Sequence, residues 1–329
     1  MKVSIQTLGS LGDVMPFITT AKQLEKLGAT VSILAPRDYT TVIRGHGIHA
    51  SEPPDFSLDL WNREAEQRGT LSGPLNFLRD WPDMVEPYVA DIMEQSLHAA
   101  EGADVILANG ICAPARLAAE HYKIPYLLHA LQPVISPTSE TPCAMVWRPW
   151  QGQILNKYGY GVVWIAQTFM ERALRPHRKR LHLEDMPSFN QTRTHLNQPL
   201  PRISSISPCL MDQKPADWAE NDFLLAYPSL EELPLDALPE DLRAFSAAGP
   251  PPVFVSLGSL EGETPIRLID TIFSALEHLG LRAIVSDALA SKLSSGRLAA
   301  HFVVGHVSHP PLFKLCSAII HHGGAGVMH

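Results

Sequence analysis

The stretch KVSIQTLGSLGDVMPFITTAKQLEKLGATVSILAP, residues 2–36, decides the fold that the sequence predicts. It opens with the alternating apolar residues of a strand and passes through a glycine turn into an amphipathic helix. We expect Ala21, Leu24 and Leu27 on the buried face of this helix and Gly28 at its end. A second apolar strand follows. The stretch therefore predicts a βαβ unit, from which parallel sheets are built.

The same rhythm returns further along the chain. The strand ADVILANG at 103–110 is followed by a helix over 113–122 and a second strand, IPYLLHA, at 124–130. After residue 252 strands and helices alternate again, up to the strand SAIIHH at 317–322. The sequence thus predicts an α/β protein with two similar domains, each built on a parallel sheet with helices on its faces.

Composition fits a globular protein of two domains. Of the 329 residues, 45% are apolar and 18% are charged. The net charge of −8 gives no field that would attract nucleic acid. The four cysteines lie far apart and form no C-x-x-C pair: Cys112, Cys143, Cys209 and Cys316. We therefore expect reduced thiols and a cytoplasmic protein. No apolar run approaches the roughly 18 residues of a membrane span, so any membrane contact would be peripheral.

A shift in composition suggests where the domains meet. Residues 228–252 mix acidic residues with prolines and end in Gly-Pro-Pro-Pro, which is typical of an exposed connection. We therefore expect an N-terminal domain over residues 1–228, a linker over 229–251 and a C-terminal domain over 252–329.

Two segments are open to two interpretations each. The region 52–100 is rich in large apolar side chains, which favours core packing over ligand contact: Phe56, Trp61, Phe77, Trp81 and Met84. One helical stretch carries a dense basic run, which favours a solvated helix face over a patch for anionic lipid or phosphate: Arg172, Arg175, Arg178, Lys179 and Arg180.

Four short motifs stand where predicted strands end. They are GSLGD at 9–13, LGS at 257–259, GHVSH at 305–309 and HHGGAG at 321–326. In open parallel sheets ligands bind at the carboxyl ends of strands. Glycines at such ends let backbone N–H groups approach an anion, and a following helix directs its positive end toward it. The motifs therefore favour a diphosphate ligand, the alternative being tight turns without a ligand.

Other phosphate-binding patterns and metal centres are disfavoured. The chain lacks the G-x-x-x-x-G-K-[ST] motif of ATPases, and its first glycine turn lacks the G-x-G-x-x-G spacing of NAD enzymes. Histidine ligands for zinc would need cysteines or carboxylates at suitable spacing, which are missing around His306, His309, His321 and His322. We expect no metal, and one of these histidines beside a phosphate.

Together these motifs, in this order and spacing, resemble the GT-B glycosyltransferases of the UDP-glycosyltransferase superfamily. The likeness is strongest to enzymes that glycosylate sterols, lipids or natural-product aglycones, and it covers residues 1–329. It implies two Rossmann-like domains, of which the C-terminal one is incomplete here. The N-terminal domain would bind the acceptor and the C-terminal domain the nucleotide-sugar, with no cofactor or metal besides this donor.

The resemblance also implies roles for individual residues. Asp13 is the expected general base, because a carboxylate at a strand end can take the proton of an acceptor hydroxyl; its alternative role is to cap the helix. The remaining expected site residues would contact the nucleotide-sugar donor through their backbone or side chains: Ser10, Gly12, Gly258, Ser259, Val307, His321, Gly323, Gly324, Gly326 and Val327. Of these, Val307 would lie against the nucleotide base.

The expected reaction is inverting transfer of a hexose or deoxyhexose from a UDP- or dTDP-sugar to a hydroxyl of a hydrophobic lipid, sterol or natural-product acceptor. The partners would be these two small molecules, with no nucleic acid and at most a peripheral membrane contact. One alternative is a catalytically impaired GT-B-like binding or helper protein, and another is a nucleotide-sugar epimerase.

The sequence departs from the family in two places. Val327 stands where the family usually has a threonine, so a hydroxyl contact to phosphate is missing. The family also continues beyond the position of His329 with elements that grip the donor sugar. We therefore expect the sequence to be part of a longer protein.

Overall fold

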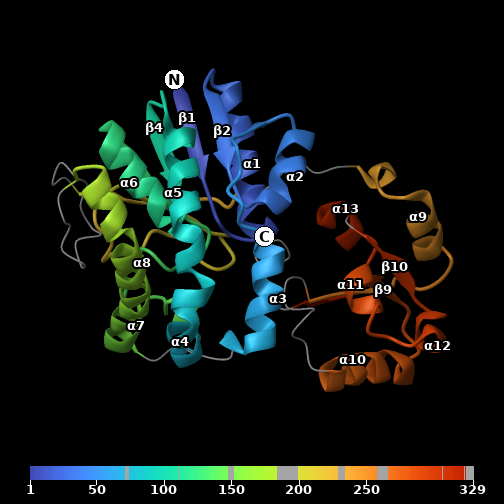
Figure 1. Cartoon of the computed structure of the whole chain (residues 1–329). Helices are drawn as coiled ribbons and strands as arrows, with labels where there is room; N and C mark the ends of the chain where they lie inside the picture. The colour runs from blue at the N-terminus through green and yellow to red at the C-terminus, as the bar shows by residue number, and fades with distance from the viewer. Residues whose placement is uncertain are drawn as a thin grey trace. The chain divides into compact units, whose positions relative to one another are not determined.

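The computed structural model describes residues 1–70, 74–110, 112–146, 152–183, 199–228, 234–257, 266–305, 307–321 and 323. The chain divides into two compact units, residues 1–229 and residues 230–329. Each unit holds one parallel sheet flanked by helices (Figure 1). The prediction of two Rossmann-like α/β domains is confirmed.

Within its described residues the first unit has a sheet of seven parallel strands in the order β3-β2-β1-β4-β5-β6-β7. The strands are β1 (Lys2–Gln6), β2 (Thr30–Leu34), β3 (His49–Ala50), β4 (Val105–Ala108), β5 (Tyr126–Ala130), β6 (Arg202–Ser205) and β7 (Asp222–Leu225). The helices are α1 (Leu11–Lys26), α2 (Thr40–Gly45), α3 (Leu58–Arg68), α4 (Pro74–Met84), α5 (Glu86–Ala100), α6 (Ala113–Tyr122), α7 (Gln153–Gly159) and α8 (Gly161–Arg180). Short 3-10 turns form η1 (Arg37–Tyr39) and η3 (Ala144–Val146).

Both faces of this sheet are buried because successive strand residues point to opposite sides. On β4, Ile106 packs into the cluster formed with α5 and α6, whereas its neighbour Leu107 packs into the cluster formed with α1 and α2. Figure 1 shows these helices around the strands. The first unit is therefore a three-layer structure whose strand ends remain available for a site.

Helix α1 follows its predicted course with one correction. Ala21 is fully buried and Leu24 packs against the same cluster, but Leu27 is 84% exposed. The helix ends one residue before Leu27, and Gly28 follows with φ +85°. Leu27 is the C-cap residue, and at 100° per residue its side chain lies away from the buried face that Phe17 and Ala21 form.

The aromatic region 52–100 forms helices α3, α4 and α5. Phe56, Trp81 and Met84 are buried, and the Trp61 indole N–H donates to the Met84 carbonyl at 2.6 Å. Core packing therefore explains these side chains, while the Phe77 side chain lies outside the described residues.

The second unit has, in its described part, four parallel strands in the order β10-β9-β8-β11. These are β8 (Val253–Ser256), β9 (Ala283–Ser286), β10 (Phe302–Val304) and β11 (Ala318–His321). Its helices are α9 (Glu240–Ala247), α10 (Ile266–His278), α11 (Asp287–Ala290), α12 (Ser295–Leu298) and α13 (His309–Phe313), with the 3-10 turn η4 (Leu235–Ala237).

Part of the expected linker belongs to the core of this second unit. Leu242 of α9 is fully buried in a cluster with Phe254 and Leu312. Acidic residues and prolines gave the segment the composition of an exposed connection, but its Leu238 and Leu242 are buried in this cluster. No helix in the described part of the chain is both long and apolar enough to cross a bilayer.

Candidate active site

Asp13 lies in the first turn of α1, at the carboxyl end of β1. Ser10 is the N-cap residue, and Asp13 Oδ2 accepts hydrogen bonds from the Ser10 N–H at 2.8 Å and from the Ser10 hydroxyl at 3.2 Å. Among the described residues, Oδ1 accepts no hydrogen bond. The carboxylate is thus held through one oxygen at the positive end of a 16-residue helix.

Gly9 makes this arrangement sterically possible. A Cβ atom at position 9 would lie 2.2 Å from Asp13 Oδ2 and 2.3 Å from its carboxyl carbon. No real contact is that short, so any side chain at Gly9 would displace the carboxylate. The first glycine of the GSLGD motif therefore makes room for its aspartate.

Burial sets the electrostatics of Asp13. Removal from water raises its pKa above the ordinary aspartate value, and the two hydrogen bonds from Ser10 act against this rise. A carboxylate with a raised pKa is a stronger base than an exposed one. Asp13 therefore has the position and the environment of a proton acceptor.

Two tyrosines near Asp13 were not anticipated from the sequence. Burial and the charges of Asp59, Asp38 and Asp13 raise the pKa of Tyr39 to about 12, against a hydrogen bond from the backbone of Leu11. Burial and the charge of Asp13 likewise raise the pKa of Tyr227. Both phenols therefore stay protonated and can donate hydrogen bonds near the carboxylate.

These tyrosines come from distant parts of the first unit. Tyr39 ends η1 after β2, next to β1 in the sheet, and Tyr227 follows β7 at the far edge. In the sequence, the only feature that could indicate a role for either tyrosine is its position a few residues after an apolar strand. That signal does not reveal that the chain after β7 brings Tyr227 within electrostatic reach of Asp13.

A second polar layer lies at the ends of β1, β4, β5 and β6. The Asn109 amide donates to the Thr7 hydroxyl at 2.7 Å, and His129 Nε2 pairs with the Ser205 hydroxyl at 2.7 Å. Burial lowers the pKa of His129 to about 4, so its imidazole is neutral at physiological pH. The ring of Phe17 on α1 packs edge-on against it at 5.1 Å. His129 of this layer thus packs against α1 through Phe17.

In the second unit, His321 stands at the carboxyl end of β11, paired in register with Ser256 of β8. Its Nδ1 accepts a hydrogen bond from the Gly323 N–H at 3.1 Å. In the neutral imidazole the proton then sits on Nε2, which becomes a donor. Gly323 has φ +87°, a conformation that favours glycine.

The other expected donor-site residues are only partly described. Val307 packs against the cluster around Phe254, just before α13. His309 stacks on Phe313 with ring centroids 5.2 Å apart, so it is a packed residue. The remaining members lie outside the described residues: Gly258, Ser259, Gly324, Gly326 and Val327, together with His306 and His322.

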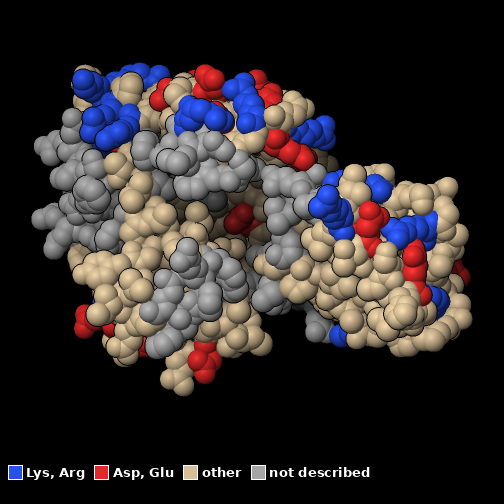
Figure 2. All heavy atoms as spheres, turned by 90° about the horizontal axis from the view of Figure 1, so that it is seen from below, with Lys and Arg blue, Asp and Glu red and all other residues tan. Residues whose placement is uncertain are grey.

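The structure thus brings Ser10, Gly12 and Asp13 together in the first unit, and His321 and Gly323 together in the second. Within the described ranges, no three His, Cys, Asp or Glu side chains converge as metal ligands. Figure 2 shows basic and acidic side chains intermixed along the upper edge of the drawn face, whereas mainly acidic ones stand along its lower left edge.

Comparison with known proteins gives relatives along the whole chain, although no protein-family model matches it. A sterol 3-beta-glucosyltransferase of Arabidopsis thaliana is 25% identical over 340 residues, covering 99% of this chain and 54% of the plant protein. The vancomycin aglycone glucosyltransferase of Amycolatopsis orientalis is 28% identical over 348 residues, covering 100% of this chain and 77% of that protein. The chain therefore spans about half the length of the plant relative and three quarters of the bacterial one.

Solved structures show the same fold. The glycosyltransferase SsfS6 of Streptomyces sp. SF2575, complexed with thymidine diphosphate, superposes with a TM-score of 0.56 at 17% identity, covering 100% of this chain and 78% of that one.

Proposed function

We propose that this chain, which is similar to GT-B glycosyltransferases of the UDP-glycosyltransferase superfamily, transfers a hexose or deoxyhexose from a UDP- or dTDP-sugar to a hydroxyl of a hydrophobic acceptor. The observation that carries this proposal is the Asp13 carboxylate, which lies half-buried at the start of α1 and is bound by Ser10 through one oxygen only.

The proposed reaction is a single displacement with inversion at the anomeric carbon. Asp13 Oδ1 takes the proton of the acceptor hydroxyl as its oxygen bonds to the anomeric carbon. The bond from that carbon to the diphosphate oxygen breaks, and the nucleoside diphosphate leaves with the electron pair. Attack from the side opposite to the leaving group inverts the configuration.

Stabilising the departing diphosphate would fall to the second unit. The bond from the Gly323 N–H to His321 Nδ1 supports Nε2–H as a donor to a phosphate oxygen. The glycines of the two C-terminal motifs, among them Gly258 and Gly324, would add backbone donors, with Ser259 beside them and Val327 contributing only its N–H. Val307 would lie against the base of the nucleotide.

The relatives support both substrate classes. A neighbouring structure holds thymidine diphosphate, and the names of two relatives specify a sterol and the vancomycin aglycone as acceptors. These acceptors present a hydroxyl on a large framework. A cytoplasmic location and a reaction without a metal cofactor belong to the same proposal.

A donor and acceptor screen tests the function. The protein is incubated with UDP-glucose or dTDP-glucose and a panel of sterols and polyketide or peptide aglycones, with product mass and anomeric configuration read by mass spectrometry and NMR. We expect glycosides of inverted configuration with at least one pair. Donor binding by calorimetry without transfer to any acceptor would favour the helper protein instead, and turnover of the donor without an acceptor would favour the epimerase.

A further inference from the structure

Helices α7 and α8 carry an exposed stripe that nothing in the proposed reaction uses. Tyr160 between them keeps helical dihedral angles, φ −65° and ψ −15°, so residues 153–180 form one helical rod, in which Pro176 of α8 removes one backbone hydrogen bond. At 1.5 Å per residue this rod is about 40 Å long. Five large apolar side chains on it are exposed: Ile154 by 72%, Leu155 by 57%, Tyr158 by 79%, Val162 by 40% and Ile165 by 56%.

The apolar residues share one face with the basic run. At 100° per residue, all of them fall within an arc of about 160°, and four exposed basic residues of α8 fall within the same arc: Arg172, Arg175, Lys179 and Arg180. The buried residues Tyr160, Leu174 and Arg178 project from the opposite side. No acidic residue of the two helices, as described, falls within the arc.

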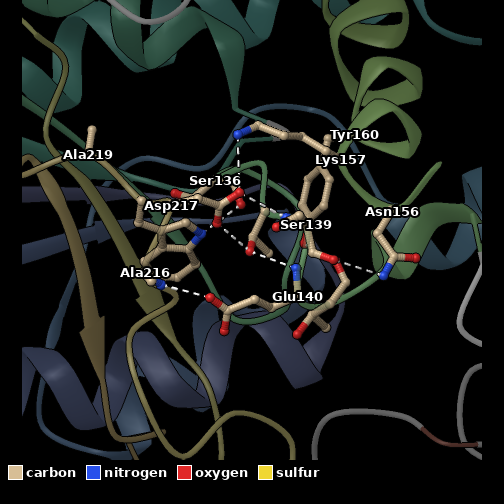
Figure 3. Close-up of polar contacts among 12 residues, drawn as sticks. Ser136, Ser139, Glu140, Asn156, Lys157, Tyr160, Ala216, Asp217 and Ala219 are labelled. Carbon is tan, nitrogen blue, oxygen red and sulfur yellow. Dashed lines mark hydrogen bonds and ion pairs between the residues drawn. The ribbon is translucent and has the colours of Figure 1, made fainter. Parts of the chain in front are cut away.

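The inner side of the rod is fixed to the first unit. Asn156 of α7 donates to the Ser139 carbonyl at 3.1 Å (Figure 3), and the hydroxyl of Tyr160, between the two helices, donates to the Thr141 carbonyl at 3.2 Å. At the edge of the exposed arc, Lys157 Nζ lies 3.1 Å from Asp217 Oδ2. On α8, Arg178 pairs with Glu120 of α6 at 2.7 Å. The rod cannot rotate to bury its apolar stripe without breaking these contacts.

We propose that this face of α7 and α8 is a docking surface for an anionic lipid bilayer, with the apolar half entering the interface and the basic half contacting lipid phosphates. Apolar side chains beside Lys and Arg, without acidic residues, are the composition of helices that lie in the membrane interface. Each basic residue close to an anionic leaflet adds about 1 kcal/mol of attraction.

A second copy of the chain fits this face less well. A two-fold pairing along the stripe would set basic residues beside basic residues or against the apolar half of the partner. A bilayer satisfies both halves at once, because its acyl boundary and its phosphate groups lie side by side. Docking would bring the first unit, with Asp13, to the phase in which a lipid-like acceptor dissolves.

The test is co-sedimentation of the full chain with vesicles of equal parts phosphatidylglycerol and phosphatidylcholine, compared with vesicles of phosphatidylcholine alone. We expect binding that is at least tenfold stronger to the anionic vesicles and that weakens as salt is added. Vesicle binding is measured without turnover. A negative result in this experiment therefore does not bear on the proposed sugar transfer, and a negative result in the transfer assay does not bear on the proposed docking surface.

Two sets of variants, each with a matched control set, test whether vesicles bind at this face of α7 and α8. An apolar set, Ile154→Ser, Tyr158→Ser and Ile165→Ser, is compared with Leu27→Ser, Ile266→Ser and Leu279→Ser, whose side chains lie elsewhere and are at least 65% exposed. A basic set, Arg172→Gln, Arg175→Gln and Lys179→Gln, is compared with Arg44→Gln, Arg63→Gln and Arg267→Gln. We expect each test set to weaken vesicle binding tenfold or more, and the controls to leave it within about twofold.

Three results would overturn the proposal. The first is the absence of binding to anionic vesicles, and the second is an equal loss in test and control sets. The third is a dimer in analytical ultracentrifugation that the apolar set converts to monomer, because the face would then join two copies of the chain. Circular dichroism confirms that each variant is folded before it is compared.

Discussion

Gly9 and Asp13 illustrate how much a single residue decides at this site. Replacing Gly9 by Ala places a Cβ atom where the carboxylate stands, so we expect the free energy of unfolding to fall by about 1–3 kcal/mol and turnover to fall with it. Urea unfolding and steady-state rates measure both effects. Gly45→Ala is the matched control, since no atom lies within 4 Å of a Cβ atom there. Equal behaviour of the two variants would show that the carboxylate does not occupy this space.

The raised pKa of Asp13 predicts two pH effects. Turnover requires the ionised carboxylate, so the rate falls as pH drops through a value above that of an ordinary aspartate.

The contribution of Asp13 to the free energy of unfolding changes with pH in the opposite direction. A group whose pKa is higher in the folded state stabilises the fold at low pH, and this contribution is lost as pH rises through the folded pKa. Asp13→Asn should therefore be more stable than the wild type at neutral pH, with the difference shrinking in acid. Thermal unfolding across pH measures this difference, and a constant difference would contradict it.

At the scale of elements, α8 is held to α6 by a buried ion pair. Arg178 and Glu120 lie 2.7 Å apart, with side chains only 2% and 6% exposed. Glu120→Ala would leave the guanidinium buried without this carboxylate, so we expect a loss of about 3–5 kcal/mol in the free energy of unfolding. The exposed pair of Arg68 and Asp83 is the control, since Asp83→Ala should cost no more than about 1 kcal/mol. Similar losses in urea unfolding would contradict the assigned burial.

The same pair shows where sequence reasoning about elements ends. The βαβ order, the helix of the first motif and the packing role of Trp81 follow from local periodicity. Arg178, by contrast, reads as one more cation of a solvated basic run, because its partner is 58 residues away in the sequence. The end of α1 at Gly28 was predicted correctly, but the exposure of Leu27 was not, because the C-cap residue no longer lies on the buried face of the helix.

At the scale of the whole molecule, the two Rossmann-like units could be predicted from the sequence. The approach of Tyr39 and Tyr227 to Asp13 could not, because it depends on the path that the chain takes after strands β2 and β7. The role of Leu242 in the core of the second unit was hidden in the same way, by a composition that resembles a linker. The ends of strands can be predicted from a sequence, whereas tertiary packing determines which other segments lie next to them.

The central claim is that this protein transfers a sugar and that Asp13 takes the proton. The most direct measurement is the turnover number of Asp13→Asn, beside UDP and dTDP affinity from calorimetry, with Glu25→Gln on the exposed side of the same helix as control. We predict that turnover falls by about 10²–10⁴-fold in the Asp13 variant alone, with nucleotide affinity unchanged. Turnover of Asp13→Asn equal to that of the wild type would contradict the account.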